Sequence, residues 1–179
     1  NATEITHDFG SYPGFNDDIT CIKQQSDGKI LVGGRYTCYQ GALQNRLIRL
    51  NADGSKDVSF DIESGFNSDV EDILIQPDGK ILVCGRFSKF QDSPQRGLIR
   101  LNVDGSNDKS FDIGSGGNDV YSLGLQSNGK IIIAGGFQVF NGYGQRNIIR
   151  LNSNGSRDIS LKISTGFYDY VDQIIIQPD

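Results

Sequence analysis

The sequence lacks several residue types on which disulfide frameworks, catalysis and membrane insertion depend. It has no methionine and no tryptophan, a single histidine at His7, and three cysteines at Cys21, Cys38 and Cys84. Three cysteines at non-equivalent positions do not make an even disulfide framework, so we expect ordinary thiols that behave as small apolar side chains. No apolar run approaches the roughly twenty residues that a membrane helix needs, and we therefore expect no membrane insertion.

The chain also lacks an excess of positive charge. Its formal net charge is −5, and lysine and arginine are scattered singly along it. Because such a chain offers no basic face to phosphates, we expect no nucleic-acid partner.

Motifs that mark common enzyme classes are missing as well. The sequence contains no Gly-x-Ser-x-Gly elbow, no phosphate-binding Gly-Lys-Ser/Thr loop and no cluster of His and Cys ligands. The paired acids Asp17-Asp18 and Glu71-Asp72 are candidates for acid-base work on a glycan, but adjacent acids in an acidic chain are typical of solvated surface. We expect a protein that is not an enzyme.

What the sequence does contain is a repeat. The segments SDGKILVGGRY from Ser26, PDGKILVCGRF from Pro77 and SNGKIIIAGGF from Ser127 match closely. Farther on, RLIRLNADGSKDVSF from Arg46 is matched by two further copies, at spacings of about 51 and 50 residues set by the equivalent lysines. Periodicity of this length indicates repeated supersecondary units.

Each unit divides into extended segments separated by turns. In the second copy, a first strand ends at Gln76, an Asp-Gly turn follows at 78–79, and a nearly all-apolar strand covers 81–84. A third strand over 98–102 is followed by a second Asp-Gly turn and a short extended piece around Phe111. Asp-Gly and Asn-Gly favour the positive φ of tight hairpins. Four extended segments in about fifty residues predict a four-stranded antiparallel blade that needs sister blades on both faces.

The fold class predicted is therefore all-β, a row of β-propeller blades. We divide the chain into the tail of a preceding repeat (1–14), three repeats (15–65, 66–116 and 117–166) and the first strand of a fourth repeat (167–179). A β-trefoil also suits three such units, but it would close after the third, whereas this chain begins a fourth in phase. The two end fragments together omit the apolar second strand, so we expect a partial or open propeller. Further repeats, of the same or another chain, are expected partners.

The repeat resembles a known family, the bacterial delta-60 repeat, a β-propeller-type unit. The resemblance spans essentially the whole chain and rests on Asp78 to Phe87, Leu98 to Phe111 and their equivalents. The third copy departs from the pattern at Gly136, Asn154 and Leu161. The resemblance implies a part of a large secreted, surface-associated or virion protein without catalytic activity, and so an extracellular, cell-surface or virion location.

Two features recur in every copy and are best explained by architecture. An arginine lies near an aspartate beyond the second turn, and a charge-assisted bond is expected between them. These structural pairs are Arg49 with Asp57, Arg100 with Asp108, and Arg150 with Asp158. The intervening Asn-x-Asp-Gly-Ser-x-Asp gathers oxygen atoms as a calcium loop does, yet placing Gly54 at the sixth loop position puts Arg49 at the first ligand position. We therefore favour a turn and expect no cofactor, with calcium as the weaker alternative.

Positions that differ between copies are free to serve a partner. The variable loop after the second strand and the stretch between units carry six candidate partner-binding aromatics: Tyr39, Phe90, Phe140, Tyr143, Tyr168 and Tyr170. Aromatic side chains among amides and glycines are typical of protein and sugar contacts. The first three are equivalent to one another, so packing between blades is the alternative for them.

These observations favour a non-catalytic scaffold that mediates binding, adhesion or assembly through inter-strand loops, with a protein or a glycan as partner. A lectin-like or glycan-active domain, with its site at the channel lined by the blades, is the second hypothesis. A phage tail structural component is the third.

Overall fold

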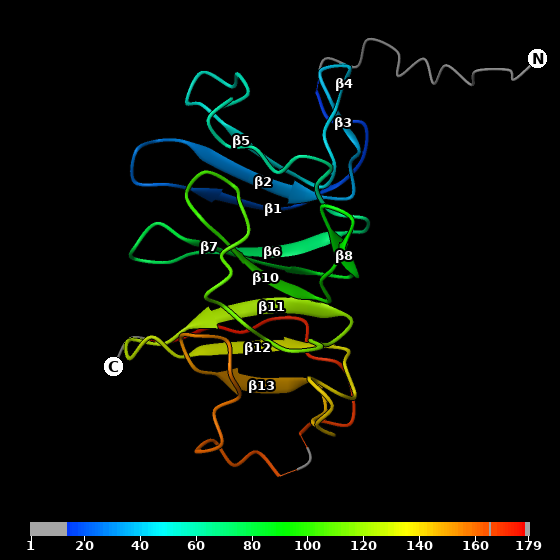
Figure 1. Ribbon diagram of the computed structural model, residues 1–179, viewed down its shortest axis with the longest axis vertical. Coiled ribbons are helices and arrows are strands. Elements are labelled where there is room, and N and C mark those ends of the chain that lie inside the picture. The colour runs from blue at the N-terminus through cyan, green and yellow to red at the C-terminus, as the bar shows by residue number, and fades with distance from the viewer. Residues whose placement is uncertain (1–13, 165, 178–179) are drawn as a thin grey trace, which may run out of the picture.

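Three small antiparallel sheets, one from each repeat, make up the body of the protein (Figure 1). The computed structural model describes residues 14–164 and 166–177, and the regular elements within these are all strands. The first sheet has the order β1-β2-β5, with β1 at Ile19–Gln24, β2 at Ile30–Gly34 and β5 at Leu47–Leu50. The middle strand β2 pairs with β1 before it and, beyond the variable loop, with β5, so this sheet is an antiparallel meander.

The second and third sheets repeat this plan. The second contains β6 (Val70–Ile75), β7 (Ile81–Gly85) and β10 (Leu98–Leu101), and the third contains β11 (Val120–Leu125), β12 (Ile131–Gly135) and β13 (Ile148–Leu151). Strand β6 packs against both β1 and β11, so the first strands of the three repeats are neighbours. In Figure 1 the sheets follow one another along the longest axis, as neighbouring blades do in a propeller that is not closed.

The variable loop forms a short hairpin beside the sheet in the first two repeats. These hairpins are β3 (Cys38–Tyr39) with β4 (Ala42–Leu43), and β8 (Lys89–Phe90) with β9 (Ser93–Pro94). The third repeat has a single bridge at the same place, between Phe140 and Tyr143.

The turn chemistry expected from the sequence is present. Gly79, in the turn between β6 and β7, has φ of 83°, and Gly105, in the second turn, has φ of 92°. At Gly105 a Cβ atom would also lie 2.7 Å from the carbonyl oxygen of Asp61 in the preceding repeat. Glycine is therefore required there both by backbone conformation and by the close approach of the neighbouring repeat.

The apolar second strand β7 is buried because it faces two interfaces. Ile81 and Val83 of β7 belong to the core shared with the first sheet, whereas Leu82 and Cys84 belong to the core shared with the third. Alternate side chains of a strand point to opposite faces of a sheet. A continuous apolar run is thus the pattern of a strand in the middle of a stack of sheets.

The prediction of a four-stranded sheet in each unit is wrong, because the main sheet of each described repeat has three strands. The fourth segment touches the third strand at one bridge only, Leu101 with Asn107 in the second repeat. Beyond it, the Asp108 carboxylate accepts bonds from the backbone N–H and the hydroxyl of Ser110, at 3.0 and 2.7 Å. Side-chain bonds of this kind turn the chain and compete with a strand ladder. The segment then packs on the next repeat, where the Asp112 N–H donates to the Asn154 carbonyl at 2.9 Å.

Candidate functional site

Each repeat contains a buried cluster built around one aspartate. In the second repeat, Oδ2 of Asp108 accepts bonds from Nε of Arg100 at 2.7 Å and from Nζ of Lys80 at 2.8 Å. The guanidinium also lies 4.6 Å from the ring centroid of Phe111. The Arg49–Asp57 and Arg150–Asp158 pairs are in contact as well, at 2.7 and 2.6 Å.

The cluster also joins one repeat to the next. Nη1 of Arg100 donates to the carbonyl of Ser153 at 2.7 Å, and Nη1 of Arg49 donates to the carbonyl of Val103 at 2.6 Å. Both acceptors lie in the second turn of the following repeat. Arg49 and Arg100 therefore each connect the aspartate of their own repeat to the neighbouring blade, which is a structural role.

The cluster keeps its aspartates ionised. Burial raises the pKa of Asp108, but hydrogen bonds from Lys80, Ser110 and Arg100 lower it by more, so the pKa lies well below its ordinary value. The pKa of Asp57 is lowered in the same way. For Asp158 the largest cause is the bond from Lys130, followed by Ser160 and Arg150. A carboxyl group held ionised in this way suits an ion pair and not proton donation.

The Asn-x-Asp-Gly-Ser segment forms a turn that uses its own oxygen atoms. Oδ1 of Asp53 accepts bonds from the backbone N–H and the hydroxyl of Ser55, at 3.0 and 2.6 Å. Asn51 donates to the Ser55 hydroxyl at 3.0 Å. Within residues 14–164 and 166–177, no three His, Cys, Asp or Glu side chains group closely enough to hold a metal ion.

Two of the six candidate aromatics lie in the interior. Phe90 and Phe140 are each 1% exposed, so their selection as partner-binding residues is corrected to packing between the hairpins and the sheets. Phe90 stacks at 4.8 Å on Phe66. Tyr39 is half-buried, packs at 4.6 Å on Phe15, and donates its hydroxyl to the Gly54 carbonyl at 2.7 Å. These aromatics fix the hairpins to the blades.

The other three candidates are exposed. Tyr143 is 50% exposed, Tyr168 93% and Tyr170 61%. Arg157 lies over the Tyr143 ring at 4.7 Å, and Arg146 lies over the Tyr168 ring at 5.8 Å. All three belong to the third repeat or to the segment that follows it, so the available aromatic surface gathers at one end of the described structure.

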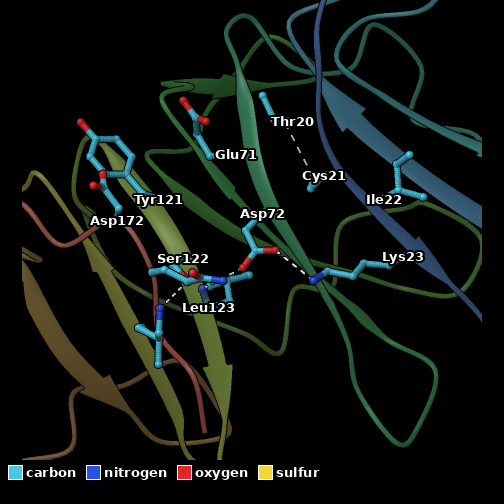
Figure 2. Close-up of a pocket in the computed structure, with 12 residues that line it drawn as sticks. Thr20, Cys21, Ile22, Lys23, Glu71, Asp72, Tyr121, Ser122, Leu123 and Asp172 are labelled. Carbon is cyan, nitrogen blue, oxygen red and sulfur yellow. Dashed lines mark hydrogen bonds and ion pairs between the residues drawn. The ribbon is translucent and has the colours of Figure 1, made fainter.

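The first strands of the repeats line an open cavity of about 510 Å³ (Figure 2). Its walls are residues 20–23 of β1, 71–72 of β6 and 121–123 of β11, and the segment 172–174 supplies a fourth wall. Figure 2 shows Glu71, Tyr121 and Asp172 on one side and Lys23 on the other, with Asp72 between them. Of the residues that line this cavity, the sequence analysis selected only the acid pair Glu71-Asp72.

Most charged groups of this cavity already have partners. Asp72 accepts the Leu123 backbone N–H at 3.0 Å and lies 3.4 Å from Nζ of Lys23. Glu71 accepts a 2.8 Å bond from Nε of Arg86. The paired acids predicted from sequence thus serve to connect strands and repeats.

The thiol in the cavity wall is not activated. Burial raises the pKa of Cys21 to about 12. At neutral pH this side chain remains a protonated thiol, a poor nucleophile.

One kind of contact between repeats was not predicted, although the sequence contains a signal for it. In the second and third repeats, the side chain that follows the β-bulge of the first strand accepts a backbone N–H of the next repeat: Asp72 that of Leu123, and Ser122 that of Ile174 at 3.0 Å. These two polar residues occupy equivalent positions in β6 and β11. Their recurrence marks them as connectors between repeats.

Three antiparallel meanders, packed through their first strands and joined by the same arginine contact, define a β-propeller-type repeat protein. A family model described as a domain of unknown function (DUF5122) β-propeller matches residues 25–60, 76–111 and 126–160. The matches cover more than half of the chain, and the protein belongs to this family. No curated protein matches the chain significantly. In the described residues no helix is long and apolar enough to cross a membrane.

Proposed function

We propose that this protein is a non-catalytic β-propeller scaffold that mediates binding, adhesion or assembly in an extracellular, cell-surface or virion protein. The resemblance to the delta-60 repeat supports this location. The function would be exerted through exposed side chains at the loops, with a protein or glycan as partner and further repeats as neighbours.

The observation that carries the proposal is a division of labour between repeated and variable residues. Repeated polar residues are used in contacts within and between blades, as Arg100 and Asp108 show. Variable aromatics such as Tyr143, Tyr168 and Tyr170 are exposed. Exposed aromatic groups on a rigid scaffold are typical of recognition surfaces.

A lectin-like or glycan-active domain is the second candidate, because the cavity between the first strands brings Tyr121 near the carboxylates of Glu71 and Asp172. Sugar recognition uses aromatic faces together with carboxylates and amides. Bonds from Arg86 to Glu71 and from Leu123 to Asp72 favour a structural use of these acids over hydrolysis.

A glycan array and a glycoside-hydrolysis screen test the proposal together. We expect no turnover, and we expect any array signal to fall when Tyr143, Tyr168 and Tyr170 are all changed to alanine. Val58→Ala is the control, because Val58 is 88% exposed and lies elsewhere. Turnover that disappears in Glu71→Gln or Asp172→Asn would overturn the proposal in favour of the enzyme.

A further inference from the structure

One position near the rim of the cavity holds a cation in two repeats and a glycine in the third. The equivalent residues are Arg35, Arg86 and Gly136, each following the second strand of its sheet. Arg35 lies between repeats, 3.5 Å from a carboxylate oxygen of Asp18 and 3.6 Å from one of Asp69. The guanidinium at this position therefore bridges one blade to the next.

The contacts of Arg86 show what surrounds the guanidinium group at this position. Its Nε donates to Glu71 of its own repeat at 2.8 Å, and its guanidinium carbon lies 4.9 Å from the ring centroid of Tyr121 in the following repeat. One carboxylate and one aromatic face thus hold the group. Arginine is suited to this arrangement because its planar group stacks and forms directed bonds at the same time.

In the third repeat the same arrangement exists with its two members exchanged. Tyr121 occupies the position of Glu71 in its own repeat, and Asp172 occupies the position of Tyr121 in the next. Tyr121 and Asp172 both line the central cavity, where Figure 2 shows their side chains in the same part of the view. Gly136 supplies no side chain to lie between them.

An open cleft of about 270 Å³ is found at this glycine. Its walls include Tyr121, Gly136, Gln138, Tyr168, Asp169 and Tyr170. Arg146 also lines the cleft, with its guanidinium over the Tyr168 ring at 5.8 Å. Asp119, whose carbonyl accepts the Gly136 N–H at 2.7 Å, and Asp172 are both close enough to raise the Tyr121 pKa. The cleft and the surroundings of Tyr121 thus contain three carboxylates, Asp119, Asp169 and Asp172, and two guanidinium groups, those of Arg86 and Arg146.

We propose that the cleft at Gly136 binds the guanidinium group of an arginine presented by a partner protein. The incoming side chain takes the place that Arg86 occupies one repeat earlier, stacking on tyrosine and pairing with Asp172. This inference rests on the proposed binding function and deepens it by naming the chemistry of the partner. Lysine is the poorer fit because an ammonium does not stack or form the directed fork of bonds.

The experiment is an NMR titration of the ¹⁵N-labelled protein with acetyl-Gly-Arg-Gly-amide. Matched peptides carry lysine or citrulline in place of arginine, because citrulline keeps the shape and removes the charge. We expect the arginine peptide to shift the amide signals of Gly136, Tyr121 and Asp172, with at least about a fivefold lower affinity for the lysine peptide and no saturable shift with citrulline.

Two variants locate the site. Gly136→Arg should abolish the shifts, because its own side chain would fill the cleft. The substitution should be tolerated, since a Cβ at this position meets only the flexible Tyr121 side chain, with the hydroxyl at 3.0 Å. Asp172→Asn, at an exposed position, should weaken binding at least about fivefold. Asp92→Asn, which removes an exposed carboxylate from another loop, is the control and should bind as the unmodified protein does. Retained amide-signal dispersion would show that each variant is folded.

Equal binding of the citrulline or lysine peptide, shifts located away from Gly136, or unchanged binding in Gly136→Arg would each overturn the inference. None of these results would indicate turnover or change the exposure of the tyrosines, so the proposed scaffold function would stand.

Discussion

The second and third repeats share a sequence pattern but not the same burial. Leu82 and Leu98, on the face of the second sheet that meets the third, are both fully buried. The equivalent Ile132 and Ile148 of the third sheet are only half-buried. Pairing within each sheet is nevertheless the same in the two repeats. The sequence motif thus specifies the backbone of a blade, while its burial is supplied by its neighbours.

The arginine clusters differ in the same direction. Arg100 donates to the Ser153 carbonyl of the following repeat, whereas the corresponding nitrogen of Arg150 donates to Gln126 of its own repeat at 3.3 Å. The Arg100 side chain is 9% exposed and that of Arg150 is 16% exposed. A cluster enclosed by two blades should therefore contribute more to stability than one enclosed by a single blade.

The largest difference between the repeats is expected for an acid placed in the core. Leu98→Asp buries an unpaired carboxylate between the second and third sheets and should cost more than about 4 kcal/mol of unfolding free energy, enough to unfold its blade and disturb the adjacent ones. Ile148→Asp places the same group at a half-buried position and should cost about half as much. Urea unfolding followed by circular dichroism measures both. Equal losses would show that the two strands have equivalent environments.

The second difference concerns the arginine that connects blades. Arg100→Met removes one partner of a buried pair and should cost about 3 kcal/mol, because the Asp108 charge then lies buried with Lys80 alone. Arg150→Met should cost about 1 kcal/mol, since its side chain is more exposed and its contacts stay within one repeat. The difference between the two variants in urea unfolding tests the bridging role. A larger loss for Arg150→Met would contradict it.

The third prediction uses acid to weaken the clusters. Because the folded-state pKa values of Asp108 and Asp158 are lowered, their contribution to stability is fully present above the unfolded pKa of about 4 and is lost as the pH falls below it. Asp108→Asn should lower stability at pH 7 and flatten the decline between pH 5 and pH 2. Asp158→Asn should flatten it less, and its effect should be more sensitive to salt. Thermal melts at a series of pH values provide the measurement.

The sequence predicts the features that each repeat forms from its own residues. The second strand, the third strand and both glycine turns follow from local patterns, as at Ile81 to Cys84 and at Gly79 and Gly105. The pairing of each arginine with its aspartate also follows, because the same two residues recur at the same spacing.

What the sequence did not reveal depends on contacts between repeats. The segment around Phe111 has a strand-like composition, yet the bonds of Asp108 to Ser110 and of Asp112 to the next repeat hold it as a turn. Phe90 and Phe140 occur in a polar loop, yet the hairpin folds them back into the core. The cleft at Gly136 was visible only as a departure from the pattern, since its walls come from two repeats.

The smallest effect should come from restoring the aromatic ring that the third repeat lacks. Arg100 lies over Phe111 at 4.6 Å, whereas the residue equivalent to Phe111 is Leu161, which is half-buried beside Arg150. Leu161→Phe should therefore stabilise the protein by about 0.5–1 kcal/mol through a new cation–π contact and added apolar burial.

A double-mutant cycle separates these two contributions. In an Arg150→Met background, the gain from Leu161→Phe should shrink to the part due to burial, because the cation is gone. Phe111→Leu, the reverse change in the second repeat, should lower stability by more than Leu161→Phe raises it, because Phe111 is 9% exposed and packs against the third sheet. If Leu161→Phe stabilises equally with and without the arginine, the ring acts as an apolar surface alone, and the two repeats differ in packing but not in the chemistry of their clusters.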